Sequence, residues 1–129
     1  MLKILVIDDD MDVCEIMKIY LRDLGHEVVT FNNGPEGIQK CDESYDLVIT
    51  DRRMPGMLGE EVIHKIKRLF PNIRAVLMTG DLNEAVRPTI IAAGAEEIWP
   101  KPLDLDRVKQ FLENFYKGGE KENGKDKSY

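Results

Sequence analysis

The sequence predicts an α/β domain: a doubly wound, five-stranded parallel sheet with helices on both faces. Three observations predict this fold. Short, β-rich apolar runs recur along the chain, and such runs are typical of strands buried on both faces of a parallel sheet. Stretches with helical periodicity lie between them. Glycine and proline separate many of these segments, so strand and helix alternate as in right-handed βαβ units.

Each predicted strand is a short apolar run that ends near a polar residue or a turn signal. The first run, Lys-Ile-Leu-Val-Ile, is followed by three aspartates, and the third run ends just before Asp51. Pro55 and Gly59 then break the chain into a loop. Thr79 closes the fourth run. The predicted strands cover residues 3–7, 27–31, 46–50, 73–78 and 96–99.

The helices are predicted from apolar residues three and four positions apart, which give each helix one apolar face. Asp10 or Asp12 is expected to cap the first helix, and Gly25 to end it. Pro88 would disrupt a helix interior, so we predict a long loop after the fourth strand and a short helix that begins near Arg87. The predicted helices cover residues 13–24, 34–41, 60–69, 87–93 and 104–115, with Ile16 and Leu69 among the inward-facing side chains.

Composition and charge argue against several classes of function. A chain of 129 residues with 43% hydrophobic and 33% charged residues is typical of one globular domain. The net charge of −6 argues against a general nucleic-acid-binding surface. No apolar run approaches the roughly 20 residues that span a bilayer, and the amino terminus lacks a signal-peptide layout. Cys14 and Cys41 have no metal-ligand spacing, so we expect both to be reduced in a cytoplasmic protein.

Polar side chains stand where the predicted strands end, and five of them form a chemically coherent set: Asp8, Asp9, Asp51, Thr79 and Lys101. Open α/β sheets bind ligands in the crevice at the carboxyl ends of their strands. Three carboxylates in one crevice repel one another, and a divalent cation with hard oxygen ligands, such as Mg²⁺, relieves that repulsion. A metal, a nucleophilic carboxylate, a hydroxyl and a lysine together suit phosphoryl transfer to aspartate.

Each of these residues alone has an ordinary structural explanation, such as a turn, a solvated acidic cluster or a surface lysine. A calcium loop starting at Asp8 is rejected, because Val13 stands where that loop needs glycine and Ile19 where it needs glutamate. Arg52 and Arg53 follow Asp51 in a loop, and we expect both to be solvated.

A set of short motifs, in this order along the chain, resembles the receiver domain of response regulators, the chemotaxis-regulator-like module of two-component signalling. They are Ile-Leu-Val-Ile-Asp-Asp ending at Asp9, the stretch from Asp51 to Gly59, Met-Thr-Gly around Thr79, Gly-Ala from Gly94, and Pro-Lys-Pro around Lys101. The resemblance implies a flavodoxin-like (βα)5 fold with strand order 2-1-3-4-5. It assigns residues 1–117 to the receiver domain, and leaves residues 118–129 as a disordered polar tail or truncated linker.

The resemblance implies a role for each site residue. Asp51 is the phosphoacceptor for a histidine kinase phosphohistidine. Asp9 binds Mg²⁺ directly, and Asp8 helps directly or through water. Asp51 and the backbone carbonyl of Arg53 complete the protein ligands.

The resemblance also implies how the signal leaves the site. Thr79 would hydrogen-bond one phosphoryl oxygen and Lys101 would pair with another, next to a cis peptide before Pro102. Movement of Thr79 would repack the surface of the fourth helix, fifth strand and fifth helix. Ile98 stands where the family usually has Tyr or Phe, so either Thr79 suffices for switching or the neighbouring Trp99 contributes.

The expected partners are a histidine kinase or phosphotransfer protein and a downstream protein or output domain, with no nucleic acid or membrane bound directly. Family members often form homodimers through the fourth helix, fifth strand and fifth helix. We expect no enzyme with an external substrate, only self-catalysed phosphorylation and slow autodephosphorylation. Whether the chain is a stand-alone receiver or an excised piece of a longer regulator stays open.

Two rival functions are weaker. Phosphatases of the haloacid dehalogenase type also use an aspartyl nucleophile and Mg²⁺, but carry Asp-x-Asp-x-Thr or Val after their first strand. Counting from Asp8, the last place of that motif is Asp12. A receiver that had lost phosphorylation and acted only as a scaffold would have no need of the complete acidic set with Lys101.

Overall fold

The computed structural model describes residues 1–115 and confirms the predicted architecture. Residues 116–117 of the predicted domain, and the predicted tail at 118–129, lie outside the described residues. The main sheet contains β1 (Lys3–Ile7), β2 (Glu27–Phe31), β3 (Leu47–Asp51), β6 (Arg74–Thr79) and β7 (Glu97–Pro100). The helices are α1 (Met11–Asp23), α2 (Gly34–Lys40), α3 (Gly59–Leu69), α4 (Arg87–Ala93) and α5 (Leu105–Glu113).

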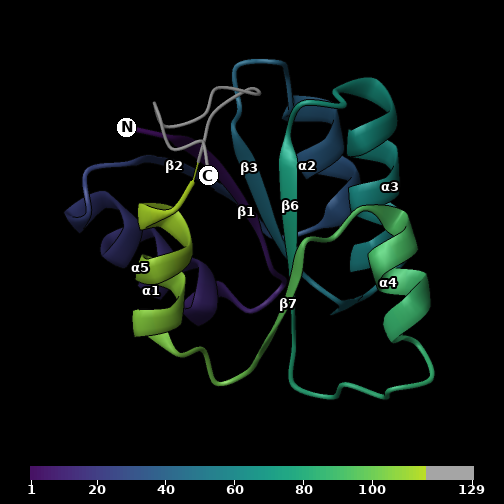
Figure 1. Ribbon diagram of the computed structural model, residues 1–129. Helices are drawn as coiled ribbons and strands as arrows, with labels where there is room; N and C mark the ends of the chain where they lie inside the picture. The colour runs from purple at the N-terminus through teal and green to yellow at the C-terminus, as the bar shows by residue number, and fades with distance from the viewer. Residues whose placement is uncertain (116–129) are drawn as a thin grey trace, which may run out of the picture.

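The five strands are parallel and lie in the order β2-β1-β3-β6-β7, the predicted 2-1-3-4-5 order of the sheet strands. Helices α1 and α5 cover one face of the sheet, and α2, α3 and α4 cover the other (Figure 1). The chain enters every strand of the sheet from the same end. The loops that follow the strands therefore meet at the opposite end, at the bottom of Figure 1.

Alternating side chains of each strand supply the two halves of the core. Ile4 and Val6 belong to the cluster beneath α1 and α5, whereas Leu5 and Ile7 belong to the cluster beneath α2, α3 and α4. All four are fully buried, because successive side chains of a strand point to opposite faces and both faces are covered.

Local signals set the helix boundaries as predicted. The Asp10 carboxylate accepts a hydrogen bond from the Asp12 backbone N–H at 2.9 Å and caps α1. Helix α4 begins at Arg87, with Pro88 in its first turn, where no intrahelical hydrogen bond is lost. Gly94 ends α4 with a φ of 119°, a conformation that glycine adopts without strain.

Two residues predicted to face the core are exposed instead. Ile16 is 54% exposed because the buried stripe of α1 runs through Cys14, Met17 and Leu21, and Ile16 lies beside it. Leu69 is 60% exposed because it is the last residue of α3, beyond the buried stripe that ends at Ile66. Cys14 and Cys41 are buried and form no disulfide.

A small hairpin that the sequence did not predict joins β3 to α3. It pairs β4 (Arg53–Met54) with the antiparallel β5 (Met57–Leu58), and Gly56 turns between them with a φ of 84°. The hairpin closes where the Gly59 N–H donates to the Arg52 carbonyl at 2.8 Å. The loop after Asp51 is therefore an ordered element.

Within residues 1–115, the helices are too short or too polar for any of them to cross a membrane.

Candidate functional site

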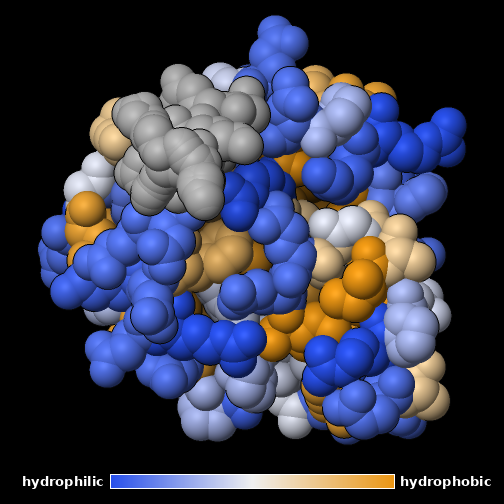
Figure 2. Space-filling model, in the orientation of Figure 1, coloured by the Kyte–Doolittle hydropathy of each residue, from blue (hydrophilic) through white to orange (hydrophobic). Residues whose placement is uncertain are grey.

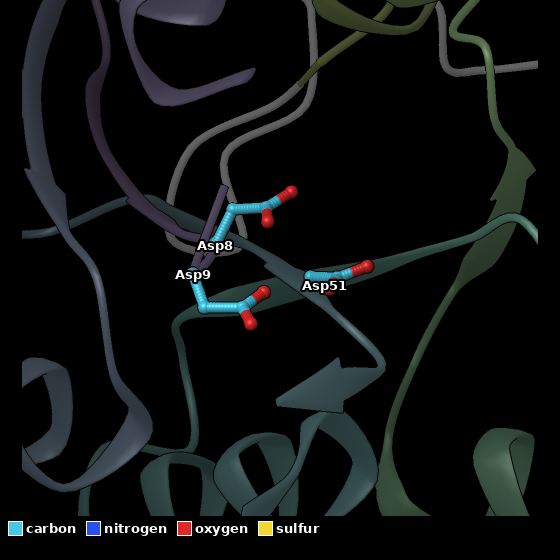
Figure 3. Close-up of side chains that lie close together, drawn as sticks. All are labelled: Asp8, Asp9 and Asp51. Carbon is cyan, nitrogen blue, oxygen red and sulfur yellow. The ribbon is translucent and has the colours of Figure 1, made fainter. Parts of the chain in front are cut away.

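Three aspartates meet at the carboxyl ends of β1 and β3. Parallel pairing places Ile7 opposite Thr50, so Asp8, which follows β1, and Asp51, the last residue of β3, lie close together. Asp8, Asp9 and Asp51 each offer an oxygen, and these oxygens lie within 4.8 Å of one another. Figure 3 shows the three carboxylates directed into the same space. The structure thus brings together all three acids that the sequence singled out.

Their environments differ. Asp8 is fully buried, Asp51 is 7% exposed, and Asp9 lies on the surface. The Asp10 backbone N–H donates to Asp8 Oδ1 at 2.9 Å, which fixes the Asp8 carboxylate beneath the start of α1. The site therefore has a buried floor and one side that is open to solvent.

Lys101 reaches the same cluster from the loop after β7. Its Nζ lies 2.7 Å from Asp8 Oδ2 and 3.0 Å from Asp51 Oδ1. The peptide bond between Lys101 and Pro102 is cis, as the resemblance implies. The Lys101 N–H donates to the Thr79 carbonyl at 2.9 Å, which ties this loop to the end of β6. One ammonium thus bridges two carboxylates at the centre of the site.

Burial and pairing set the charges here. Burial raises the pKa of Asp8 above its usual value, and the hydrogen bonds from Lys101 and from the Asp10 N–H offset this only in part. Burial alone would lower the pKa of Lys101, but its hydrogen bonds to Asp8 and Asp51, with their charges, give a net rise. Lys101 therefore stays protonated, while ionisation of Asp8 still costs free energy that a further cation would offset.

The donor set suits a hydrated magnesium ion. Three carboxylates outnumber the single ammonium among them, and all three supply the hard oxygen ligands that Mg²⁺ prefers. The exposed Asp9 leaves room for the waters that Mg²⁺ retains. Arg53 begins β4, two residues after Asp51, and its backbone carbonyl as a ligand stays a prediction.

Thr79 ends β6, next to β3. The register pairs Asp51 with Met78, so Thr79 comes one residue beyond the position opposite Asp51. Thr79 is 2% exposed, and its hydroxyl oxygen accepts a hydrogen bond from the Asp81 N–H at 3.1 Å. The hydroxyl is thus buried at the start of the loop that leads to α4.

Ile98 and Trp99 face opposite layers of the protein. Ile98 belongs to the cluster beneath α2, α3 and α4, whereas Trp99 packs edge-on against Phe111 of α5, with ring centroids 5.6 Å apart. The Trp99 indole N–H donates to Glu97 Oε1 at 2.6 Å. Neighbouring residues of a strand point to opposite faces of the sheet. Trp99 therefore does not fill the place of the aromatic residue that the family resemblance implies at position 98.

The expectation that Arg52 is solvated is wrong. Its side chain is 8% exposed and forms an ion pair with Glu60 on α3, with Nη2 2.9 Å from Oε2. The backbone N–H of Arg52, just past the end of β3, still donates to the Met78 carbonyl of β6 at 2.9 Å. The only hint of this ion pair in the sequence is the acidic Glu60 in the first turn of α3. Arg53 is 62% exposed, as expected.

Comparison with known proteins identifies the family of the domain. The family model for the response regulator receiver domain matches residues 4–113. The transcriptional regulatory protein ZraR of Klebsiella oxytoca is 36% identical over 110 residues, which cover 84% of this chain and 25% of ZraR. The first curated relatives that match are longer proteins, and the chain spans between a quarter and about half of their length.

Solved structures share the fold. A two-component response regulator from Clostridium difficile superposes with a TM-score of 0.82 at 25% identity, covering 88% of this chain and 93% of the other. The receiver domain of DrrB, in a BeF3-activated form, gives a TM-score of 0.77 at 32% identity, covering 88% of this chain and 98% of DrrB's.

Proposed function

The chain belongs to the response regulator receiver domain family, and we propose that it is a phosphorylation-activated switch of the cytoplasm. In this proposal, Asp51 accepts a phosphoryl group from the phosphohistidine of a histidine kinase or phosphotransfer protein. The observation that carries the proposal is the position of the Asp51 carboxylate, 3.0 Å from Lys101 Nζ and grouped with Asp8 and Asp9.

The transfer is a substitution at phosphorus. A carboxylate oxygen of Asp51 forms the new bond to phosphorus, and the bond to the donor imidazole nitrogen breaks. Lys101 remains protonated and offsets charge on the transferring oxygens, since its pKa is raised in this site. Mg²⁺ held by Asp8, Asp9, Asp51 and the Arg53 carbonyl would supply further neutralisation and orientation of the phosphoryl oxygens.

Thr79 connects the site to the rest of the domain. Its hydroxyl is bound to the Asp81 N–H in this conformation. In the proposed switch, the hydroxyl turns to donate a hydrogen bond to a phosphoryl oxygen, and the loop between β6 and α4 moves with it. Two states of that loop, whose populations phosphorylation shifts, are enough to carry the signal.

The surface of α4, β7 and α5 is the proposed output face. Figure 2 shows apolar surface gathered between β7 and α4, with smaller apolar areas elsewhere in the view. Ile91 of α4 is 48% exposed. We propose that this face contacts a downstream protein, an output domain of a longer regulator or a second copy of the chain. The domain itself would not contact nucleic acid.

The proposed reaction has no external substrate to turn over, so the protein acts as a switch that modifies itself and slowly loses the phosphoryl group. The test is intact-mass spectrometry after incubation with acetyl phosphate. A single phosphoryl adduct that forms with MgCl₂ and is absent with a chelator supports the proposal. No adduct under either condition, with the protein folded, would rule it out.

A further inference from the structure

The Arg52–Glu60 pair differs from the other ion pairs among residues 1–115. Each of its side chains is only 8% exposed, whereas every other pair there has at least one side chain more than 20% exposed. Arg52 Nε and Nη2 both donate to Glu60 Oε2, at 3.2 and 2.9 Å. Glu60 Oε1 is buried and has no hydrogen-bond partner among the described residues.

Fold stability alone explains such a pair poorly. Taking two charges out of water costs more than their attraction returns unless every polar atom is satisfied, and Glu60 Oε1 is not satisfied. Apolar side chains of similar volume would fill the same space at less cost. A buried pair of this kind can instead fix the geometry of the segments that it joins.

That geometry concerns the hairpin after Asp51. Arg52 stands between Asp51 and Arg53, the acceptor and the residue whose carbonyl is the proposed metal ligand. Two hydrogen bonds hold its backbone: the Arg52 N–H donates to the Met78 carbonyl, and the Arg52 carbonyl accepts from the Gly59 N–H. The side-chain pair adds a third attachment, from Arg52 to the residue after Gly59. The hydrogen bond from the Gly59 N–H to the Arg52 carbonyl and the Arg52–Glu60 ion pair together close the base of the β4–β5 hairpin.

Gly59 shows how closely the two ends of the hairpin approach each other. A Cβ built at position 59 would overlap the Asp51 carbonyl oxygen and press on Arg52 Cα. A small displacement of α3 or of the hairpin is therefore transmitted directly to the backbone of Asp51 and Arg52, next to Arg53.

We infer that Arg52 and Glu60 are positioning residues, whose buried ion pair fixes the hairpin so that Asp51 and the Arg53 carbonyl meet one cation. The inference rests on the proposed function for the identity of that cation. Neither side chain touches the metal or the phosphoryl group in this account. Their effect reaches the site through the backbone of residues 51–53.

The test compares two Arg-paired glutamates in the same domain. Glu60→Gln removes the charge but keeps the shape of the buried partner. Glu96→Gln does the same to the pair with Arg74, which is more exposed, 27% and 36% for the two side chains, and has two bonds of 2.7 Å. A double variant, Arg52→Met with Glu60→Leu, removes both buried charges. We expect it to fold even if Glu60→Gln does not, because it leaves no buried charge unpaired.

Two measurements are made on each folded variant: Mg²⁺ affinity by amide chemical-shift titration, and hydrogen exchange of the Gly59 amide without metal. We expect Glu60→Gln and the double variant to bind Mg²⁺ about 10-fold more weakly, as when groups that orient metal ligands are lost. We also expect faster Gly59 exchange in both. Glu96→Gln should match the parent protein in both measurements.

The outcomes separate this inference from the proposed function. Gly59 exchange that stays at the parent rate in the double variant overturns the inference, whatever the magnesium result. Unchanged Mg²⁺ affinity in a destabilised Glu60→Gln variant also overturns it, since the pair would then serve stability alone. A parent protein that binds no Mg²⁺ overturns the proposed metal site, while the exchange data still decide whether the pair holds the hairpin.

Discussion

Lys101 Nζ lies 3.0 Å from Asp51 Oδ1, so the proposed phosphoacceptor is already paired with a cation before any phosphoryl group arrives. The same ammonium is 2.7 Å from the buried Asp8. This arrangement would hold the proposed nucleophile in a fixed orientation, and it would place a positive charge where negative charge accumulates in the proposed transfer.

Lys101→Met should therefore slow phosphoryl uptake by Asp51 strongly. Loss of one preorganised charge-stabilising donor typically costs about 100-fold in rate. The measurement is the rate of adduct formation from acetyl phosphate by intact mass. Lys109→Met, which removes an exposed lysine of α5, is the control and should keep the parent rate. Equal rates for the two variants would remove Lys101 from the mechanism.

The contribution of Asp8 to the stability of metal-free protein should fall as the pH rises through its raised pKa. Folding raises this pKa above its usual 3.8, chiefly through burial. Below the usual value both states are protonated. Above it Asp8 of the unfolded chain releases its proton first, so the contribution of Asp8 to the free energy of unfolding falls until folded Asp8 has ionised too. Lys101 stays protonated throughout this range.

The Asp8→Asn variant has no ionisable group at position 8. Without metal it should be more stable than the parent at pH 7, and the two proteins should differ less near pH 4. Urea unfolding with a chelator at a series of pH values measures this. Adding MgCl₂ should stabilise the parent more than the variant, because only the parent keeps all three carboxylates. A parent protein that gains stability relative to Asp8→Asn toward pH 7 would show that Lys101 outweighs burial.

Thr79→Ala should uncouple the site from the loop that follows β6. The hydroxyl accepts the Asp81 N–H, and its loss should lower the free energy of unfolding by about 1 kcal/mol. Phosphoryl uptake should continue, while the amide signals of residues 80–86 respond less to it. Thr79→Ser keeps the hydroxyl and should restore the response. A full response in Thr79→Ala would place the switch elsewhere.

Gly59→Ala should destabilise the fold, since the added methyl group overlaps the backbone of Asp51 and Arg52. The expected loss is about 1–3 kcal/mol or more, as for other overpacked sites. Gly80→Ala is the matched control near the same site, because its Cβ would lie 3.8 Å from Lys101 Cβ, an ordinary contact. Thermal unfolding of the two variants compares them directly.

The sequence predicted most of the fold and the composition of the site. The strand at Lys3–Ile7 and the helix at Arg87–Ala93 lie where their patterns place them. The reason is physical: a strand buried on both faces must be apolar throughout, and proline in a helix is tolerated in the first turn. Once the strands are parallel, residues that follow them must meet at one edge, so the aspartate cluster follows from topology.

The errors arose where tertiary contacts override local pattern. Arg52 was expected in solvent, but its backbone N–H still bonds to the Met78 carbonyl just past the end of β3, and its guanidinium pairs with Glu60. Burial of Leu69 was predicted from periodicity alone, which does not show where a helix ends against its neighbours. The β4–β5 hairpin comprises two residues per strand, too few for any alternation to show.

The most direct test of the central claim is the site of phosphorylation. Parent protein, Asp51→Asn and Asp10→Asn are incubated with acetyl phosphate and MgCl₂, and the adducts are followed by intact mass. Asp10 caps α1, a role that asparagine fills equally well, so Asp10→Asn controls for loss of a nearby carboxylate. We expect one phosphoryl group on the parent and on Asp10→Asn, and none on Asp51→Asn. A stoichiometric adduct on folded Asp51→Asn would contradict this expectation.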